Sequence, residues 1–296
     1  MLPTPKSIGK LISEALAMES EEAIEAGKLG FMARGLVQAT MPHKKTTALI
    51  HHRVNGDYHL TISAMNPTVG LPYGSVPRLL LAWLATEAIT TRNRELILGD
   101  SMSDFMRQLG MAPTGGRWGS IPRLKSQASK LFSSAIQCSF VTKDDSGQRT
   151  ALQNMLIADS ANLWWEPQNP GQQSLFESTV KLSEAFYNEI TDNPVPIDMR
   201  ALFALKKSPL ALDIYCWLTY RMSYLRNPTS IPWEALQGQF GSGYPMTSQG
   251  TRDFKKAFLT QLKKVQVVYP DCNADEGASG LLLRRSKTHI PKSIEL

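Results

Sequence analysis

Residues 109–132 read LGMAPTGGRWGSIPRLKSQASKLF. Their glycine-rich turn, TGGRWG at 114–119, leads into a basic segment with apolar residues at helical spacing. Such a turn either cradles a nucleotide phosphate or joins two helices that grip DNA. A phosphate-binding loop requires GxxxxGK[ST] after a buried strand. Here no Lys-Ser or Lys-Thr follows the glycines, and residues 101–110 before the turn have a helical pattern. The sequence therefore predicts the turn of a helix-turn-helix motif.

The segments around this turn complete the pattern of a winged helix, a helix-turn-helix followed by a β-hairpin. The predicted elements are an apolar helix at 72–90, a short strand at 94–100, a helix at 101–110, a basic helix at 121–136 and two strands within 137–165. We expect Ser101 or Ser103 to cap the 101–110 helix and Gly110 to end it. The buried stripe predicted for the basic helix consists of Leu124, Ala128, Leu131, Phe132 and Ala135.

The same order begins again near Pro194. Its predicted elements are a long apolar helix at 201–225, a short helix at 231–241, a basic helix at 251–265 and two strands, 265–270 and 279–290, around NADEGASG. The stripe of the second basic helix is Phe254, Phe258, Leu262 and Val265, which repeats the first stripe 130 residues later. The sequence therefore predicts an internal repeat.

The predicted fold class is α+β, mainly helical, with two tandem winged-helix domains. The predicted boundaries are residues 1–65 for a partly ordered N-terminal arm, 66–192 for the first unit and 193–296 for the second unit. Within the arm, residues 51–62 (HHRVNGDYHLTI) are typical of a hairpin with an Asn55-Gly56 turn. Residues 7–26 are expected to form a short amphipathic helix.

The bulk composition is that of a soluble globular protein with an anionic partner. The chain has 296 residues, 42% of them hydrophobic and 20% charged, and a formal net charge of +6. Cys138, Cys216 and Cys272 lie far apart without a CxxC pair, which disfavours a disulfide framework or a cysteine zinc site. The first 27 residues lack the apolar core of a signal peptide. We expect a cytoplasmic protein without a membrane segment.

The positive charges gather on the two predicted basic helices and on the second hairpin. No acidic residue occurs between Asp104 and Asp144, or between Glu276 and Glu295. The residues predicted to contact DNA are Arg117, Arg123, Ser126 and Lys130 in the first unit, and Thr251, Arg252, Lys255, Lys256, Lys263, Arg284, Arg285 and Lys287 in the second. Trp118 is either a further contact to the DNA backbone or a partly buried anchor. Binding through such cations releases counterions and weakens with salt.

The sequence supports a catalytic or metal site less well than a DNA-binding surface. His43, His51, His52 and His59 are crowded, but they lack HExxH and are expected to be surface residues rather than metal ligands. Tyr58 has no ligand pair that would make it a strand-cleaving nucleophile, and GxSxG is absent. We therefore expect a protein that is not an enzyme and that needs no cofactor and no metal.

Several stretches resemble the RepA family of plasmid replication initiators. They are AGKLGFMARGLVQAT (26–40), GLPYGSVPRLLLAWLATEAI (70–89), RELILGDSMSDFMRQLG (94–110), PTGGRWGSIPRLKSQ (113–127) and SPLALDIYCWLTYRMSYL (208–225). The resemblance covers about residues 26–270, and PTGGRWG and LPYGSVPRLLLAWL are specific to it. The first 25 residues and NADEGASG match poorly.

The resemblance implies two winged-helix domains that bind directly repeated origin sequences, called iterons. It implies that the second unit makes the main DNA contact, through Arg252, Lys255, Lys256 and Lys263. The first unit would make a secondary contact and dimerise. Monomers would open the origin and recruit the host replication initiator and helicase, while dimers would repress the protein's own gene. The chain would then be plasmid-associated.

Two other functions remain open at this point. A winged-helix transcriptional repressor without a role in initiation would use the same helices, although two unequal DNA-reading helices in one chain favour long, directly repeated sites over a palindrome. A strand-nicking initiator would require a metal-dependent tyrosine step.

Overall fold

A computed structural model describes residues 11, 12, 14–16, 18, 22–144, 147–163 and 178–291. The described residues of the 7–26 segment include helical positions at 11, 12, 14–16 and 18. From residue 29 to residue 192 the elements are β1 (Leu29–Ala33), α2 (Arg34–Gln38), β2 (Ile50–Asn55), β3 (Tyr58–Ala64), α3 (Ser75–Thr91), β4 (Glu95–Ile97), α4 (Met102–Gln108), α5 (Ser120–Phe132), β5 (Ser134–Asp144), β6 (Gly147–Leu156), β7 (Ala158–Asn162), β8 (Thr179–Leu182) and α6 (Glu184–Asp192). The remaining elements are β9 (Pro194–Asp198), α7 (Met199–Leu205), α8 (Pro209–Tyr224), β10 (Thr229–Pro232), α9 (Trp233–Phe240), α10 (Ser248–Val268), β11 (Ala274–Glu276) and β12 (Gly280–Leu283).

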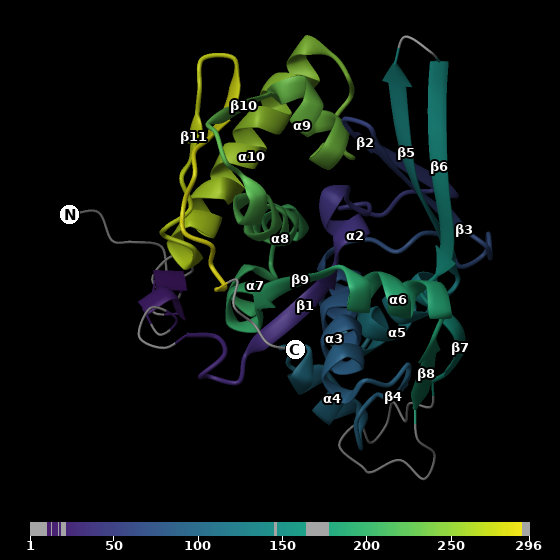
Figure 1. Cartoon of the computed structure of the whole chain (residues 1–296). Helices are drawn as coiled ribbons and strands as arrows, with labels where there is room; N and C mark the ends of the chain where they lie inside the picture. Colours follow the sequence, from purple (N-terminus) through teal and green to yellow (C-terminus); the bar gives the residue numbers. More distant parts are fainter. Residues whose placement is uncertain are drawn as a thin grey trace.

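Helices and antiparallel sheets share the fold, which is therefore mixed α/β. The strand orders of the sheets are β2-β3-β5-β6, β4-β8-β7, β1-β9 and β10-β12-β11. Figure 1 shows β1 and β9 between α3 on one side and α8 on the other, with the long β5–β6 hairpin along one edge of the molecule. None of the helices in the described ranges is long and apolar enough to cross a membrane.

The central helix of each unit is buried on nearly every side. In α3 the buried residues run without a break from Val76 to Ala85, and in α8 from Leu210 to Thr219. A helix that is apolar all round belongs in a core rather than at a surface. The buried apolar side chains of both units form one continuous cluster, which also takes in β1. The boundaries placed at residues 65 and 192 remain a prediction.

The helices on either side of the glycine-rich turn form close to their predicted positions. Ser101 caps α4, because its Oγ accepts a hydrogen bond from the backbone N–H of Asp104 at 3.1 Å. Gly110 follows the helix with φ +65°, a conformation that favours glycine. In α5 the buried face includes Leu124, Ala128 and Leu131, but of the other two predicted stripe residues Phe132 is only half-buried and Ala135 lies on β5. The predicted extension to residue 136 is wrong, because the chain enters β5 at Ser134 and pairs with β3.

The second unit departs from its prediction in two places. The predicted helix at 201–225 is two helices, α7 and α8. Ser208 caps the second of them, accepting from the N–H of Ala211 at 3.2 Å, and Pro209 fills the first helical position, where its missing N–H costs nothing. The predicted strand at 265–270 is wrong, because α10 continues to Val268. The apolar stripe continues from Val265 to Val268, so burial overrides the β-propensity of valine.

Residues assigned to the N-terminal arm are built into the body of the molecule. The 51–62 hairpin is confirmed as β2–β3, but its turn residues are Gly56 and Asp57, since Asn55 pairs with Tyr58. Gly56 has φ +59°, which suits the first position of a tight hairpin turn. Strand β3 pairs with β5, and β1 pairs with β9. The arm therefore contributes strands to both units.

A buried ion pair joins the two central helices. Arg78 on α3 is 2% exposed and Asp213 on α8 is 9% exposed. Arg78 Nε and Nη2 donate to Asp213 Oδ1 and Oδ2 at 2.6 and 2.7 Å. The remaining guanidinium N–H groups donate to the carbonyls of Met41 at 2.8 Å, Gly74 at 2.7 Å and Pro42 at 3.4 Å. The carboxylate also lies 2.7 Å from Nε2 of His43. Every partner that a buried guanidinium needs is therefore present.

The pKa shifts of Asp213 and His43 agree with the hydrogen bonds of this network. Burial alone would raise the pKa of Asp213, but the charge of Arg78 and the hydrogen bonds from His43 and Arg78 hold it below its ordinary value. Burial lowers the pKa of His43 although Asp213 opposes the shift. His43 is therefore neutral near pH 7 and donates its Nε2 proton to the carboxylate.

The expected surface position of the histidines is wrong for two of the four. His43 lies in the buried network, and His51 is 9% exposed, with its Nε2 donating to the Thr40 carbonyl at 2.8 Å. His52 is exposed on β2 and His59 is half-buried on β3. Within the described ranges, no three His, Cys, Asp or Glu side chains are grouped as a metal site requires.

We predict that Arg78→Met lowers the free energy of unfolding by about 3–5 kcal/mol, because it leaves a buried carboxylate without its partner. Urea unfolding measured at pH 7 tests this. Arg78→Met/Asp213→Leu should recover most of the loss, because it removes both charges. The matched control is Lys181→Met, which breaks an exposed pair with Glu95 and should cost less than about 1 kcal/mol. Equal losses for the two single variants would contradict the prediction.

We also predict an acid-sensitive stability that depends on His51. Burial lowers its pKa to about 4 in the folded protein, whereas the unfolded value is about 6.5. The contribution is therefore fully present above about pH 6.5 and is lost as the pH falls toward 4, by about 3 kcal/mol at that point. Urea unfolding at pH 7, 5.5 and 4.5 should show a shallower decline for His51→Gln than for the wild type. The same change at His52 should alter the decline less, because this ring is exposed and less desolvated, although burial lowers its pKa too.

Candidate nucleic-acid interface

The joint between α9 and α10 is held by the buried amide of Gln237. Its Nε2 donates to the Pro245 carbonyl at 2.8 Å, and its Oε1 accepts from the Thr251 hydroxyl at 2.6 Å. Thr247 caps α10, since its Oγ1 accepts from the N–H of Gly250 at 3.1 Å. A Cβ on Gly250 would lie 2.0 Å from the Pro245 carbonyl oxygen, so this close approach requires glycine. Thr251, predicted to contact DNA, thus uses its hydroxyl proton within the joint.

One face of α10 presents cations to solvent. Arg252, Lys256 and Lys263 are exposed, on the side opposite the buried Phe254 and Phe258. They keep the spacing that the sequence predicts for an outward face. Side chains placed in this way suit phosphate contacts along a groove of DNA.

The other predicted cations of the second unit are placed differently. Lys255 is half-buried over the Trp233 ring at 5.3 Å, and its Nζ pairs with Glu276 at 2.6 Å. Arg284 pairs with Asp275 at 2.9 Å. These pairs tie the β11–β12 hairpin to α10 and to itself, and they neutralise two of the charges predicted for DNA. The run without acids after residue 276 suggested DNA contacts, but the two acids directly before it, Asp275 and Glu276, take these cations as partners.

Arg285 and Lys287 lie at the base of the hairpin and not at its tip. The tip is the turn at 277–279, whereas both cations follow the end of β12. They line a hollow with Arg226, which follows the C-terminus of α8. They are exposed, but they form a separate basic cluster from the α10 face.

The first unit presents a smaller basic face. Arg123 and Ser126 are exposed on α5, as predicted. Lys130 is half-buried and donates from its Nζ to the carbonyl of Val69. Its pKa is lowered, first by burial and then by the nearby charge of Lys45. Lys130 therefore joins α5 to the chain before α3 rather than lying on the open face.

The turn before α5 is closed by reciprocal hydrogen bonds. The N–H of Thr114 donates to Ser120 Oγ at 2.9 Å, and the N–H of Ser120 donates to Thr114 Oγ1 at 2.9 Å. The Ser120 hydroxyl donates to the Ala112 carbonyl at 2.6 Å. A Cβ on Gly119 would lie 2.2 Å from the Thr114 carbonyl oxygen, so the turn also requires glycine here. This clamped segment, residues 112–120, is called the GGRWG loop below.

The GGRWG loop holds Arg117 and Trp118 out in solvent. Trp118 is 83% exposed, and the guanidinium carbon of Arg117 lies 5.2 Å from the centre of its ring. Trp118 is therefore not a buried anchor, and its contact to the DNA backbone stays a prediction.

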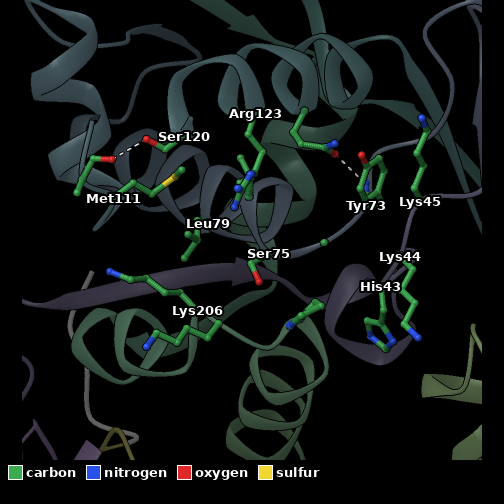
Figure 2. A pocket seen from close by; sticks show the side chains of 16 residues that line it. His43, Lys44, Lys45, Tyr73, Ser75, Leu79, Met111, Ser120, Arg123 and Lys206 are labelled. Atoms are coloured by element: carbon green, nitrogen blue, oxygen red, sulfur yellow. Dashed lines mark hydrogen bonds between the residues drawn. The ribbon is translucent and has the colours of Figure 1, made fainter. Parts of the chain in front are cut away.

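A cationic groove, which no local sequence pattern predicts, opens beside this loop. Its cavity of about 730 Å³ lies between α5, the α7–α8 turn and the segment after α2. Figure 2 shows Arg123 and Lys206 reaching the groove from opposite walls, with Lys44 and Lys45 toward one end. The cations that line it are Lys44, Lys45, Arg123, Lys206 and Lys207. Two Lys-Lys pairs were visible in the sequence, but they lie about 160 residues apart and no local pattern brings them together.

A protein-family model matches more than half of the chain. The family model described as "Plasmid encoded RepA protein" matches residues 71–234, from just before α3 to the start of α9. No match was found among curated proteins.

Two crystal structures of RctB share the fold. For one structure of domains 2 and 3 the TM-score is 0.50 at 11% sequence identity, covering 84% of this chain and 94% of that chain. For a selenomethionine derivative of the same two domains the TM-score is 0.54 at 10% identity, covering 86% of this chain and 96% of that one. At this identity the likeness concerns the fold alone.

We predict that Lys256→Ala weakens binding to duplex DNA and reduces the slope of log K against log salt by about 1, because one phosphate contact is lost. Fluorescence anisotropy with a labelled duplex at several salt concentrations measures both quantities. The matched control is the neighbouring Lys255→Ala, whose cation already has a carboxylate partner and should change the slope much less. Equal slopes for Lys256→Ala and the wild type would exclude this part of α10 from the interface.

Proposed function

We propose that this chain, which belongs to the RepA family of plasmid replication initiators, binds directly repeated sequences at a plasmid origin as a monomer. The observation that carries the proposal is the pair of exposed basic helices, α5 and α10, in one chain. Each follows a turn clamped by side-chain hydrogen bonds and precedes an antiparallel hairpin. Two such readers in a fixed order suit long sites without internal symmetry.

Both units act as winged helices in this proposal. In the second unit α8, α9 and α10 are followed by β11–β12, which forms a three-stranded sheet with β10. In the first unit α3, α4 and α5 are followed by β5–β6, whose partner is β3 of the N-terminal hairpin. Figure 1 shows both hairpins extending toward the same end of the molecule. Hairpins on one side of the chain support contact with one DNA duplex.

The second unit makes the main DNA contact and the first unit a secondary one. The α10 face offers Arg252, Lys256 and Lys263, whereas α5 offers Arg123 and the small Ser126, with Arg117 in its turn. The cations fix the position of the protein on phosphates, and the side chains that reach base edges in the major groove read the sequence.

Initiation would follow from binding free energy and not from catalysis. Contacts to the repeats offset the cost of bending and opening the neighbouring DNA, which is on the order of several kcal/mol for bending alone. The opened origin is then available to the host replication initiator and helicase. Dimerisation through the first unit would convert the protein into a repressor of its own gene. The protein would work in the bacterial cytoplasm, associated with its plasmid.

Selection of bound sequences from random duplex DNA, at low and moderate salt, tests the proposal. We predict an asymmetric site that spans about two major grooves. A double variant of α10, Arg252→Ala/Lys256→Ala, should lose most of the affinity for the selected site, whereas Arg123→Ala on α5 should lose less. A short palindrome that only α10 reads would instead indicate a transcriptional repressor.

The non-catalytic part of the proposal has its own test. Supercoiled plasmid carrying the selected site should stay intact when incubated with the protein and a divalent metal ion. A nicked product linked covalently to the protein would overturn this part and indicate a strand-nicking initiator.

A further inference from the structure

We propose that the cationic groove and the GGRWG loop together bind a short unpaired stretch of DNA, with Trp118 stacked on one of its bases. This inference rests on the proposed function, because it names a second form of DNA that the same protein would hold.

The positive charge of the groove favours a ligand that carries several negative charges. Its cations come from three separate places in the chain: the segment after α2, helix α5 and the α7–α8 turn. No carboxylate is among its described lining residues. His43 adds no charge near pH 7, because burial lowers its pKa. Between the cations the floor is apolar, formed in part by Val76, Leu79 and Met111. A ligand with phosphates along one side and flat apolar groups along the other fits both features.

The GGRWG loop adds an aromatic platform at the edge of the groove. Ala112 and Ser120, the two ends of the loop, both line the groove, and Trp118 lies on the loop between them. Trp118 is the most exposed large apolar side chain in the described part of the chain. Hydrogen bonds among Thr114, Ser120 and Ala112 fix the two ends of the loop, and the ring lies exposed to solvent between them. Arg117 already lies over the ring and adds a cation beside it.

The size of the groove favours an unpaired strand over a duplex. A cavity of about 730 Å³ has the volume of a pocket for a small ligand. In a duplex the bases are stacked on one another, so their faces are not available to an aromatic side chain. Proteins that hold single strands combine a positive track for the backbone with aromatic rings on which bases stack. Such a strand arises when the origin opens. Holding it would slow re-pairing, and it would involve both units because both contribute to the walls.

The experiment compares binding of a labelled twelve-nucleotide oligo(dT) with binding of a twelve-base-pair duplex, by fluorescence anisotropy at equal salt. We expect the full-length wild-type protein to bind both, and its tryptophan emission to be quenched by oligo(dT). Trp118→Ala should weaken oligo(dT) binding about 5- to 150-fold, the range for loss of one base–aromatic stack, and should remove the quenching. Trp118→Phe should recover part of the affinity.

Two further variants separate the groove from the duplex-binding face. Lys44→Ala/Lys207→Ala should weaken oligo(dT) binding and leave duplex binding nearly unchanged, whereas Lys256→Ala should do the reverse. Ile97→Ala, which removes an exposed apolar side chain on β4, is the matched control and should change neither. Thermal unfolding of each variant confirms that it is folded.

The outcomes distinguish this inference from the proposed function. Duplex binding without oligo(dT) binding, or wild-type oligo(dT) affinity in Trp118→Ala, would overturn the inference alone. A change in sedimentation of Trp118→Ala without a change in oligo(dT) affinity would also overturn it and would indicate that the ring contacts a second copy of the chain. Failure of the wild type to bind either DNA would overturn both proposals.

Discussion

The arrangement of the molecule depends on the bidentate pair between Arg78 and Asp213. The two side chains come from the central helices of the two units, and the guanidinium also holds the carbonyls of the segment that passes between them. Taking both charges out of water is costly, and the attraction offsets that cost only when every donor and lone pair is satisfied. One relative placement of α3, α8 and the 41–43 segment meets this condition. The groove, whose walls come from these same parts of the chain, is shaped by that placement.

The sequence predicted the parts of the fold that local physics determines. The stripes on α5 and α10, the Ser101 cap and the β2–β3 and β5–β6 hairpins all follow from spacing and turn chemistry within short windows. The errors arise where two local rules compete. Residues 265–268 are rich in valine and suggest a strand, but they continue a buried helical stripe, and packing decides. At residues 201–225 the apolar pattern hid a break at Pro209, which begins a new helix.

Contacts between segments far apart in the chain could not be predicted from the sequence. The placement of Lys44 and Lys207 in one groove depends on how the units pack, which no window of the sequence contains. Lys255 and Arg284 form ion pairs with acids on β11. The sequence shows where the cations are, but it does not show which of them have a carboxylate partner and which are open to DNA. His43 and His51 show the same limit, since a polar residue between two elements has the composition of a loop until the elements close around it. Trp118 differs in the opposite direction: it is a large apolar residue, yet it is exposed to solvent.

The pairing of β1 with β9 has a consequence for the protein during its synthesis. Leu29 pairs with Asp198, so the ribosome must add about 170 further residues before β1 can find its only described strand partner. Until then the strand presents unpaired backbone groups beside the apolar Phe31 and Met32, which are buried in the finished protein. A chain cut at the boundary between the units would keep this exposed edge permanently. The first unit is thus completed only by the second, and the nascent chain is most open to wrong pairing just before the second unit emerges.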